Sequence, residues 1–221
     1  MLDSGLPEWK SVLAVVAHPD DESFGLGAVL SAFIDSGARV CVLCFTRGEA
    51  STLGAGDLSA IRSQEFVAAA DALGVTSTWL GDYPDGHLED VGLDVLVAEV
   101  GRFADIVKPD GIVAFDSSGV TGHPDHQRAT EVAVAAAQQR TIGVLGWTLP
   151  SVVSASLGVE FGSTSMIGHA PIDIDLIVTV DRLRQLQAVH CHASQAVPGS
   201  ILWRRLELLG PREHLRWLTV P

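Results

Sequence analysis

Short apolar runs alternate with stretches of helical spacing along the first two thirds of the chain. Ser11–Ala17, Arg39–Phe45 and Asp110–Asp116 have the length and the largely continuous apolar character of buried strands. Leu58–Leu73, which stops at Gly74, is the clearest of the intervening helical patterns. Because strand and helix alternate, the sequence predicts an α/β fold, a mostly parallel sheet with helices on both faces.

The same patterns place the boundaries of each element. Strands are expected at 11–17, 39–45, 75–80 and 110–116, helices at 24–36, 58–73, 91–107 and 125–139, and polar loops at 46–57, 81–87 and 117–124. The last third is less regular, with a fifth strand within 141–156, a loop at 160–170, an edge strand at 172–180, helices at 181–192 and 201–209, and a closing strand at 215–220. No repeat or linker interrupts this order, so residues 1–221 are predicted to form a single domain.

Composition favours a compact protein with a substantial core. Of the 221 residues, 47% are hydrophobic and 19% are charged, which argues against disorder. No apolar run approaches the roughly 18 residues of a membrane span. The segment Met1–Lys10 lacks the basic and apolar regions of a secretory signal. We therefore expect a cytoplasmic protein without a membrane span.

The charge distribution bears on the partners. The net charge is −13, and lysine occurs only as Lys10 and Lys108. Arg204 and Arg205 form the densest basic pair, which we expect on a solvated helix face. A nucleic acid is therefore an unfavourable ligand, and a neutral or weakly charged small molecule fits better.

The three cysteines do not indicate a disulfide framework. Cys41 and Cys44 are three residues apart in a predicted strand, so they should point to opposite faces of the sheet. We expect them to be core thiols.

Two motifs of histidine and aspartate follow two of the predicted strands. Ala17–Glu22 reads Ala-His-Pro-Asp-Asp-Glu, and Gly122–His126 reads Gly-His-Pro-Asp-His. The acidic residues of the first motif could simply cap the helix that follows. However, open parallel sheets bind ligands outside the carboxyl ends of their strands, where the winding reverses. The first and fourth strands commonly flank that crevice, so we expect the two motifs to face each other.

Together the motifs supply the ligands of a catalytic zinc site. Two imidazoles and one carboxylate suit zinc, and such a site keeps its fourth position open. His18, Asp21 and His126 could form this set, with one Zn²⁺ per chain. A site of this kind would make the protein a metallohydrolase.

The remaining motif residues have roles in such a hydrolase. Asp20 would be the general base, and His123 would face the reacting carbonyl and its leaving group. Asp125 would orient an imidazole. Glu22 is expected to cap the helix or to support the other side chains.

These residues resemble the two signatures of the LmbE-like or PIG-L zinc N-deacetylases. The resemblance extends to Thr46–Glu49, Arg62–Glu65, Pro84–Gly86 and His192–Gln195. It implies a Rossmann-like α/β sandwich that removes an acetyl group from an N-acetylglucosamine-type sugar or glycoconjugate. The same resemblance implies zinc on His18, Asp21 and His126, with Asp20 as the base.

The resemblance also implies the substrate contacts. Arg62 and Asp85 would contact sugar hydroxyls, and His192 would line the site. His123 would stabilise the tetrahedral intermediate or protonate the amine. Some members carry a tyrosine where this chain has Thr121, which is too short to assist the oxyanion in the same way.

Other interpretations of these residues stay open. Arg62 could be a surface residue that pairs with Glu65, and Asp85 could be part of a plain turn. His87, His169 and His214 are expected at the surface, and Trp147 with Val152 and Val153 could lie in the core or in a homo-oligomer interface. The alternative functions are an amidase or esterase for another substrate, such as a thiol conjugate, and a non-catalytic sugar-binding protein.

Overall fold

A single mixed sheet organises the protein. The computed structural model describes residues 5–162 and 166–221. Seven of its strands follow the order β3-β2-β1-β4-β5-β8-β7, and β6 (Gly168–His169) pairs with β5 off this path. These strands are β1 (Ser11–Val16), β2 (Arg39–Thr46), β3 (Ser77–Tyr83), β4 (Gly111–Phe115), β5 (Gly143–Pro150), β7 (Leu176–Thr179) and β8 (Arg212–Thr219). The first five run parallel, and β8 runs antiparallel to both of its neighbours.

The central strand β1 is buried along its whole length. Its side chains alternate between two cores, with Val12 and Val16 in one and Leu13 in the other. Cys44 belongs to the first core and Cys41 to the second, which confirms that the two thiols point to opposite faces.

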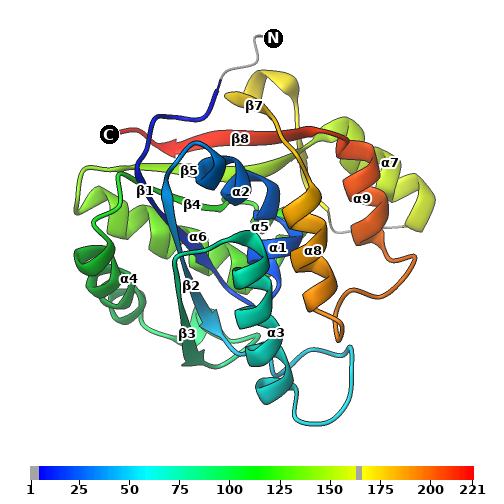
Figure 1. The fold of residues 1–221 in the computed structure, drawn as a ribbon, viewed down its shortest axis with the longest axis horizontal. Coiled ribbons are helices and arrows are strands. Elements are labelled where there is room, and N and C mark those ends of the chain that lie inside the picture. The colour runs from blue at the N-terminus through cyan, green and yellow to red at the C-terminus, as the bar shows by residue number, and fades with distance from the viewer. Residues whose placement is uncertain (1–4, 163–165) are drawn as a thin grey trace.

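Helices cover both faces of the sheet, as the alternation predicted (Figure 1). One face carries α4 (Leu93–Val107) and α6 (Pro124–Gln138), and the other carries α2 (Gly27–Asp35), α3 (Leu58–Leu73), α8 (Leu183–Cys191), α7 (Ser151–Phe161) and α9 (Ile201–Leu209). Short helical turns lie at α1 (Asp21–Phe24), α5 (Gly119–Gly122), η1 (Leu88–Asp90) and η2 (Pro171–Asp173). No helix in the described part of the chain is both long enough and apolar enough to span a membrane.

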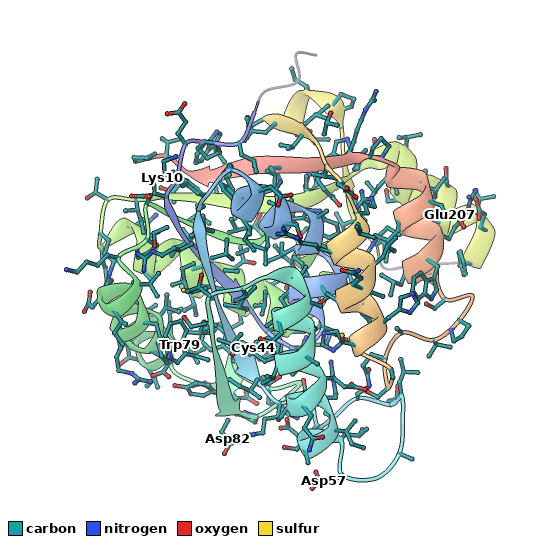
Figure 2. The ribbon with its side chains drawn as sticks, in the orientation of Figure 1. Lys10, Cys44, Asp57, Trp79, Asp82 and Glu207 are labelled. Carbon is teal, nitrogen blue, oxygen red and sulfur yellow. The ribbon has the colours of Figure 1, made fainter. Side chains whose placement is uncertain are left out.

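Side chains fill the space between these layers (Figure 2). Cys44 lies inside this packing, whereas Lys10 and Glu207 lie at the periphery. Asp57 and Asp82 both lie at the lower end of the molecule in this view. Asp57 caps α3 there, because its side chain accepts a hydrogen bond from Ala60 N.

The strands and the longer helices agree with the sequence patterns, but three segments differ. The helix expected at 24–36 is α2, which begins only at Gly27, and residues 21–24 of the expected turn form the short helix α1. Gly25, between the two helices, packs so closely on Phe115 that a Cβ there would lie 2.3 Å from the ring. The expected loop at 117–124 contains α5, and the fifth strand β5 is followed directly by α7, which reaches Phe161. The loop expected at 160–170 includes residues 163–165, which lie outside the described residues.

Two predicted surface residues are instead buried. Arg205 is only 7% exposed because it shares the inward stripe of α9 with Leu202, Leu206 and Leu209. His214 is 9% exposed, since it lies in β8 between β5 and β7. His169 is partly buried beside Asp116, whereas His87 is exposed as expected.

Candidate active site

The two histidine motifs meet at the carboxyl ends of adjacent strands. β1 pairs with β4, so the turn after β1 and the start of α6 lie side by side. His18 Nδ1 lies 3.1 Å from His126 Nε2. The predicted crevice between the first and fourth strands is therefore present.

The hydrogen bonds of the two imidazoles fix which nitrogens face each other. His18 Nε2 lies 3.0 Å from Asp85 Oδ1 and 3.2 Å from Asp125 Oδ2, so this nitrogen carries a proton. His126 Nδ1 lies 3.0 Å from the carbonyl oxygen of Gly119, so it also carries a proton. With neutral rings, His18 Nδ1 and His126 Nε2 then turn two lone pairs toward each other.

Asp21 adds a carboxylate to this pair. Its Oδ1 lies 3.2 Å from His126 Nε2, and its Oδ2 lies 3.7 Å from His18 Nδ1. The backbone N–H groups of Ala17 and His18 donate to Oδ2 and hold it in place. Burial raises the pKa of Asp21, but His126 and His18 outweigh burial and hold that pKa well below its usual range.

This arrangement fits a divalent metal ion. Three electron-pair donors converge, one each from His18, Asp21 and His126, and the donor atoms lie within 4.8 Å of one another. Lone pairs at such distances repel unless a cation or a proton lies between them. Burial lowers the pKa of His18, yet the carboxylates of Asp125 and Asp85 outweigh it and raise that pKa to about 10. The site thus attracts positive charge.

A second possible grouping shares His18 but fits a metal less well. It combines His18 with His123 and Asp125. However, the Asp125 oxygens already accept hydrogen bonds from Gly86 N at 2.7 Å and from Leu88 N at 3.0 Å. Asp125 therefore positions the His18 ring, as the sequence suggested, together with Asp85.

Asp20 lies beside the donor set in a strained conformation. Its φ of 130° is one that residues with a side chain rarely adopt. Its Oδ2 accepts a hydrogen bond from Arg62 Nη2 at 3.0 Å. Burial raises the pKa of Asp20 to about 6, although Arg62 counteracts burial. A carboxyl group with such a pKa can exchange a proton near neutrality.

Arg62 is neither a surface residue nor a partner of Glu65. Its side chain is 4% exposed and donates to the carbonyl oxygens of Gly48 and Pro19 as well as to Asp20. Glu65 instead accepts hydrogen bonds from Ser194. Arg62 therefore fixes the loop that carries Asp20, and its side chain also reaches the wall of the cavity described below.

His123 is half-buried at the start of α6. Its Nδ1 accepts a hydrogen bond from Asp125 N at 3.2 Å, so its proton resides on Nε2. Burial lowers the pKa of His123, with a further contribution from His18. The ring is therefore neutral at pH 7 and offers one N–H donor.

The structure does not bring His192 to the cavity wall. Its side chain is fully buried, and its Nε2 lies 2.7 Å from Glu22 Oε1. The other oxygen of Glu22 accepts a hydrogen bond from the backbone N–H of Asp20. His192 thus supports Asp20 through Glu22.

Most of these groups line a cavity of about 490 Å³, but His192, Glu22 and Asp125 do not. Its polar lining consists of His18, Asp20, Asp21, Arg62, Asp85, His123 and His126, together with residues 50–53, Thr121 and Gln195. Its apolar wall consists of Phe24, Phe115, Val120 and Trp147, with Arg205 beside Trp147. The volume is that of a small-molecule site. Trp147 is 1% exposed, so it belongs to the core and to this apolar wall.

The apolar wall was not predicted from the sequence. Phe115 ends a strand and Trp147 lies within one, so both have the pattern of ordinary core residues. Arg205 gave a clearer signal. Its spacing from Leu202 and Leu209 places it on the apolar stripe of its helix, where a cation requires an explanation.

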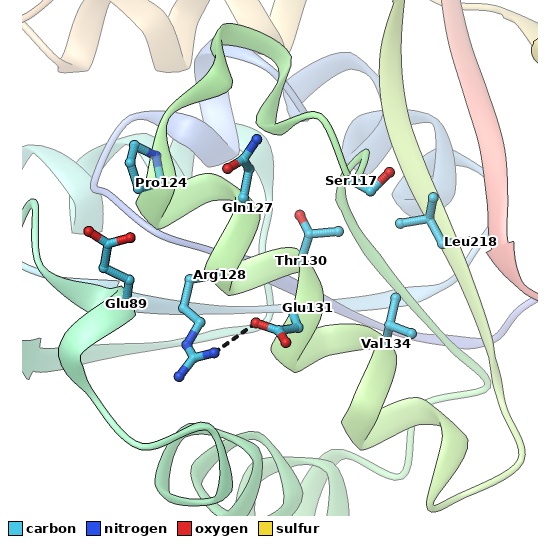
Figure 3. A pocket seen from close by; sticks show the side chains of 9 residues that line it. All are labelled: Glu89, Ser117, Pro124, Gln127, Arg128, Thr130, Glu131, Val134 and Leu218. Atoms are coloured by element: carbon cyan, nitrogen blue, oxygen red, sulfur yellow. Dashed lines mark hydrogen bonds and ion pairs between the residues drawn. The ribbon is translucent and has the colours of Figure 1, made fainter.

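A larger hollow of about 700 Å³ lies elsewhere, along the outer side of α6 (Figure 3). The charged side chains in it include Arg128 and Glu131, which already pair at 2.7 Å. None of the metal-site donors lines this hollow. The smaller cavity is therefore the candidate active site.

Residues 13–137, more than half of the chain, match the PIG-L family, which is described as GlcNAc-PI de-N-acetylase. The chain belongs to the PIG-L family. The match begins within β1 and ends within α6, so it includes both histidine motifs. The resemblance seen in these motifs is thereby confirmed.

Several curated relatives of this PIG-L chain share one name, 1D-myo-inositol 2-acetamido-2-deoxy-alpha-D-glucopyranoside deacetylase. One from Kineococcus radiotolerans is 29% identical over 59% of this chain and 45% of its own length. One from Mycolicibacterium vanbaalenii is 30% identical over 85% of this chain and 81% of its own length. The chain spans about half the length of the first of these relatives.

Solved structures share the PIG-L fold seen here. The zinc-inhibited form of teicoplanin deacetylase Orf2 has a TM-score of 0.68 and 20% identity, covering 93% of this chain and 96% of that one. GalB, the 4-carboxy-2-hydroxymuconate hydratase from Pseudomonas putida, has a TM-score of 0.73 and 18% identity, covering 96% and 97%. At these identities the likeness concerns the fold alone, and it confirms the predicted α/β architecture.

Proposed function

We propose that this protein is a metal-dependent deacetylase that hydrolyses the acetamide of an N-acetylglucosamine-type sugar or glycoconjugate. The observation that carries the proposal is the convergence of His18, Asp21 and His126 beside Asp20 and His123 in one cavity. The fold does not decide the reaction, since a hydratase shares it. The family match and the names of the relatives support an N-acetylated sugar as the substrate.

His18, Asp21 and His126 would hold the metal. Their two nitrogens and one carboxylate oxygen suit zinc, and the zinc named for one structural neighbour agrees with this choice. When bound, zinc supplies Lewis-acid chemistry, which polarises the acetyl carbonyl and makes water more acidic. Asp125 and Asp85 hold His18 in the tautomer that this role requires.

The protein's own residues then move the protons. The Asp20 carboxylate removes a proton from the water that attacks the acetyl carbon, while Arg62 keeps the carboxylate oriented. His123 Nε2–H donates a hydrogen bond to the carbonyl oxygen as it gains negative charge. Asp20 returns its proton to the sugar nitrogen when the C–N bond breaks, so water and amide yield acetate and amine. His123 supplies the donor that Thr121 is too short to provide.

The decisive test is amine release from a panel of N-acetylglucosaminides. We expect zinc-loaded wild-type protein to release amine, and Asp20→Asn to lose at least about 100-fold in kcat with zinc still bound. Asp82→Asn is the matched control, because Asp82 has an 85% exposed side chain.

Each other outcome has a definite meaning. Full turnover by Asp20→Asn at saturating zinc would refute Asp20 as the base. Cleavage of another amide or of an ester, without release of amine from any acetamide, would indicate the amidase or esterase alternative. Sugar binding without product would indicate a non-catalytic protein.

A further inference from the structure

Arg205 places a positive charge in the apolar wall of the active-site cavity. It projects from α9 on the same stripe as Leu202 and Leu206, and its side chain is 7% exposed. It lines the cavity together with Trp147 and Phe24. The proposed mechanism makes no use of this residue.

The guanidinium group makes no direct ion pair in the described structure, although the charges of Glu213, Asp21 and Asp20 act on it from a greater distance. Its Nη2 donates to the carbonyl oxygen of Phe24, and its central carbon lies 5.2 Å from the centre of the Trp147 ring. Its Nε is buried without a hydrogen-bond partner in the described structure. The oxygens of Glu213 are engaged elsewhere, since they accept from Trp147 Nε1 and from Arg182. Among the described residues Arg205 forms no ion pair.

A buried cation without a direct ion pair is unfavourable for folding alone. Burial lowers the pKa of Arg205 to about 10, so the side chain is still charged at neutral pH. Arg204, its neighbour in the sequence, shows the ordinary arrangement, because it is partly exposed and binds both carboxylate oxygens of Glu160. The energetic cost at Arg205 is offset if a ligand in the cavity brings a negative charge.

A series of ring contacts connects Arg205 with the metal-site donors. The His126 ring centre lies 4.8 Å from that of Phe115, which lies 5.5 Å from that of Trp147. Arg205 lies next to Trp147 at the far end of this series. A ligand with its acetamide at His126 therefore extends along an apolar wall toward a cation.

We propose that Arg205 binds an anionic oxygen group, a carboxylate or a phosphate, on the part of the substrate that is remote from the acetamide. The substrate class becomes N-acetylglucosaminides with an acidic aglycone or substituent. This inference rests on the proposed deacetylase function and narrows it. It also departs from the neutral ligand that the net charge of −13 favoured, because a local buried cation outweighs the distant surface charges.

The test compares two glycosides of the same shape. The carboxymethyl glycoside of N-acetylglucosamine carries a carboxylate, and the carbamoylmethyl glycoside carries a neutral amide instead. The measured quantity is the ratio of their kcat/KM values, with N-acetylglucosamine 1-phosphate as the phosphate probe. We examine wild type, Arg205→Met, Arg205→Lys and the matched control Arg204→Met.

We expect wild type and Arg204→Met to favour an anionic substrate by about tenfold or more, mainly through KM. Arg205→Met should bring the ratio close to one, and Arg205→Lys should retain part of it. Preference for the carboxylate or for the phosphate identifies the group. A ratio near one in wild type, or an unchanged ratio in Arg205→Met, would overturn the inference. A smaller folded fraction lowers the rates for both glycosides by the same factor, so it cannot by itself change the ratio.

Direct binding separates this inference from the deacetylase function. Calorimetry with Asp20→Asn gives the Kd of both glycosides without turnover. If wild type releases no amine, the proposed function fails, but a carboxylate preference that Arg205→Met abolishes still supports the anion site. Equal Kd values, or no binding of either glycoside or of the phosphate, would refute the anion site.

Discussion

Asp125 shows how one buried side chain can determine the properties of another. Its carboxylate accepts from Gly86 N, from Leu88 N and from His18 Nε2. Three donors therefore meet two oxygens, and only an ionised carboxylate can satisfy all of them. The contact fixes the proton on His18 Nε2 and leaves Nδ1 free for a metal.

Asp125→Asn should weaken zinc binding. Asparagine has an NH₂ group in place of one carboxylate oxygen, and this group would face one of the N–H groups that donate to Asp125. The His18 ring therefore loses its fixed orientation. We expect zinc affinity to fall by about 10–100-fold, measured by competition with a chromogenic chelator. Asp105→Asn is the control, because Asp105 is an exposed partner of Arg140. Unchanged zinc affinity in Asp125→Asn would show that His18 needs no carboxylate to orient it.

At the residue scale, the sequence predicted which residues belong to the site better than it predicted which residues contact one another. His18, Asp21 and His126 follow strand ends at recognisable spacing, and the structure brings them together. Arg62 and His192 could not be placed in this way, because their partners are Asp20 and Glu22, far away in the sequence. Such contacts depend on how helices pack, which local patterns do not encode.

At the scale of elements, Gly25 between α1 and α2 packs closely against another strand. Gly25 has helical dihedral angles, and the ring of Phe115 occupies the space that a side chain there would need. The sequence predicted a helix from residue 24, whereas α2 begins at Gly27. The close approach of Phe115 comes from another strand, and periodicity within one segment cannot reveal it.

Gly25→Ala should therefore destabilise the protein. The added Cβ would lie 2.3 Å from Phe115 Cε1, so the ring or the backbone must move. We expect a loss of about 1–3 kcal/mol in the free energy of unfolding, measured with urea. Gly5→Ala is the control, since no described atom lies within 4 Å of a Cβ there. Phe115→Leu should recover part of the loss in the double variant, and strict additivity of the two changes would contradict this account.

At the scale of the whole molecule, the parallel pairing of the first five strands agrees with the expectation from alternating strands and helices. The sequence also indicated an edge strand near the end of the chain, and β7 confirms it. It did not reveal that β8 inserts between β5 and β7, which buries His214. A strand placed inside a sheet needs a hydrogen-bonding strand along each edge, and for β8 these come from separate segments of the chain.

The burial of His214 makes the stability of the fold depend on pH. His214 Nδ1 is buried without a hydrogen-bond partner in the described structure. Burial, with Arg212 and Arg182 nearby, lowers the pKa of His214 to about 4. In the unfolded chain its pKa is about 6.5, so the contribution to stability is present above pH 6.5. As the pH falls from 6.5 to 4, the unfolded state takes up a proton that the folded state excludes.

His214→Gln should remove this part of the acid sensitivity. Between pH 7 and pH 4.5, wild type should lose more free energy of unfolding than the variant does, by at most about 3 kcal/mol. Urea unfolding of both proteins across this range measures the difference. Because the two proteins have the same carboxylates, the contribution of these groups to the pH dependence cancels in that difference. His87→Gln should behave like wild type, because the His87 side chain is exposed. Parallel stability curves for wild type and His214→Gln would show that protons reach the buried ring without opening the sheet.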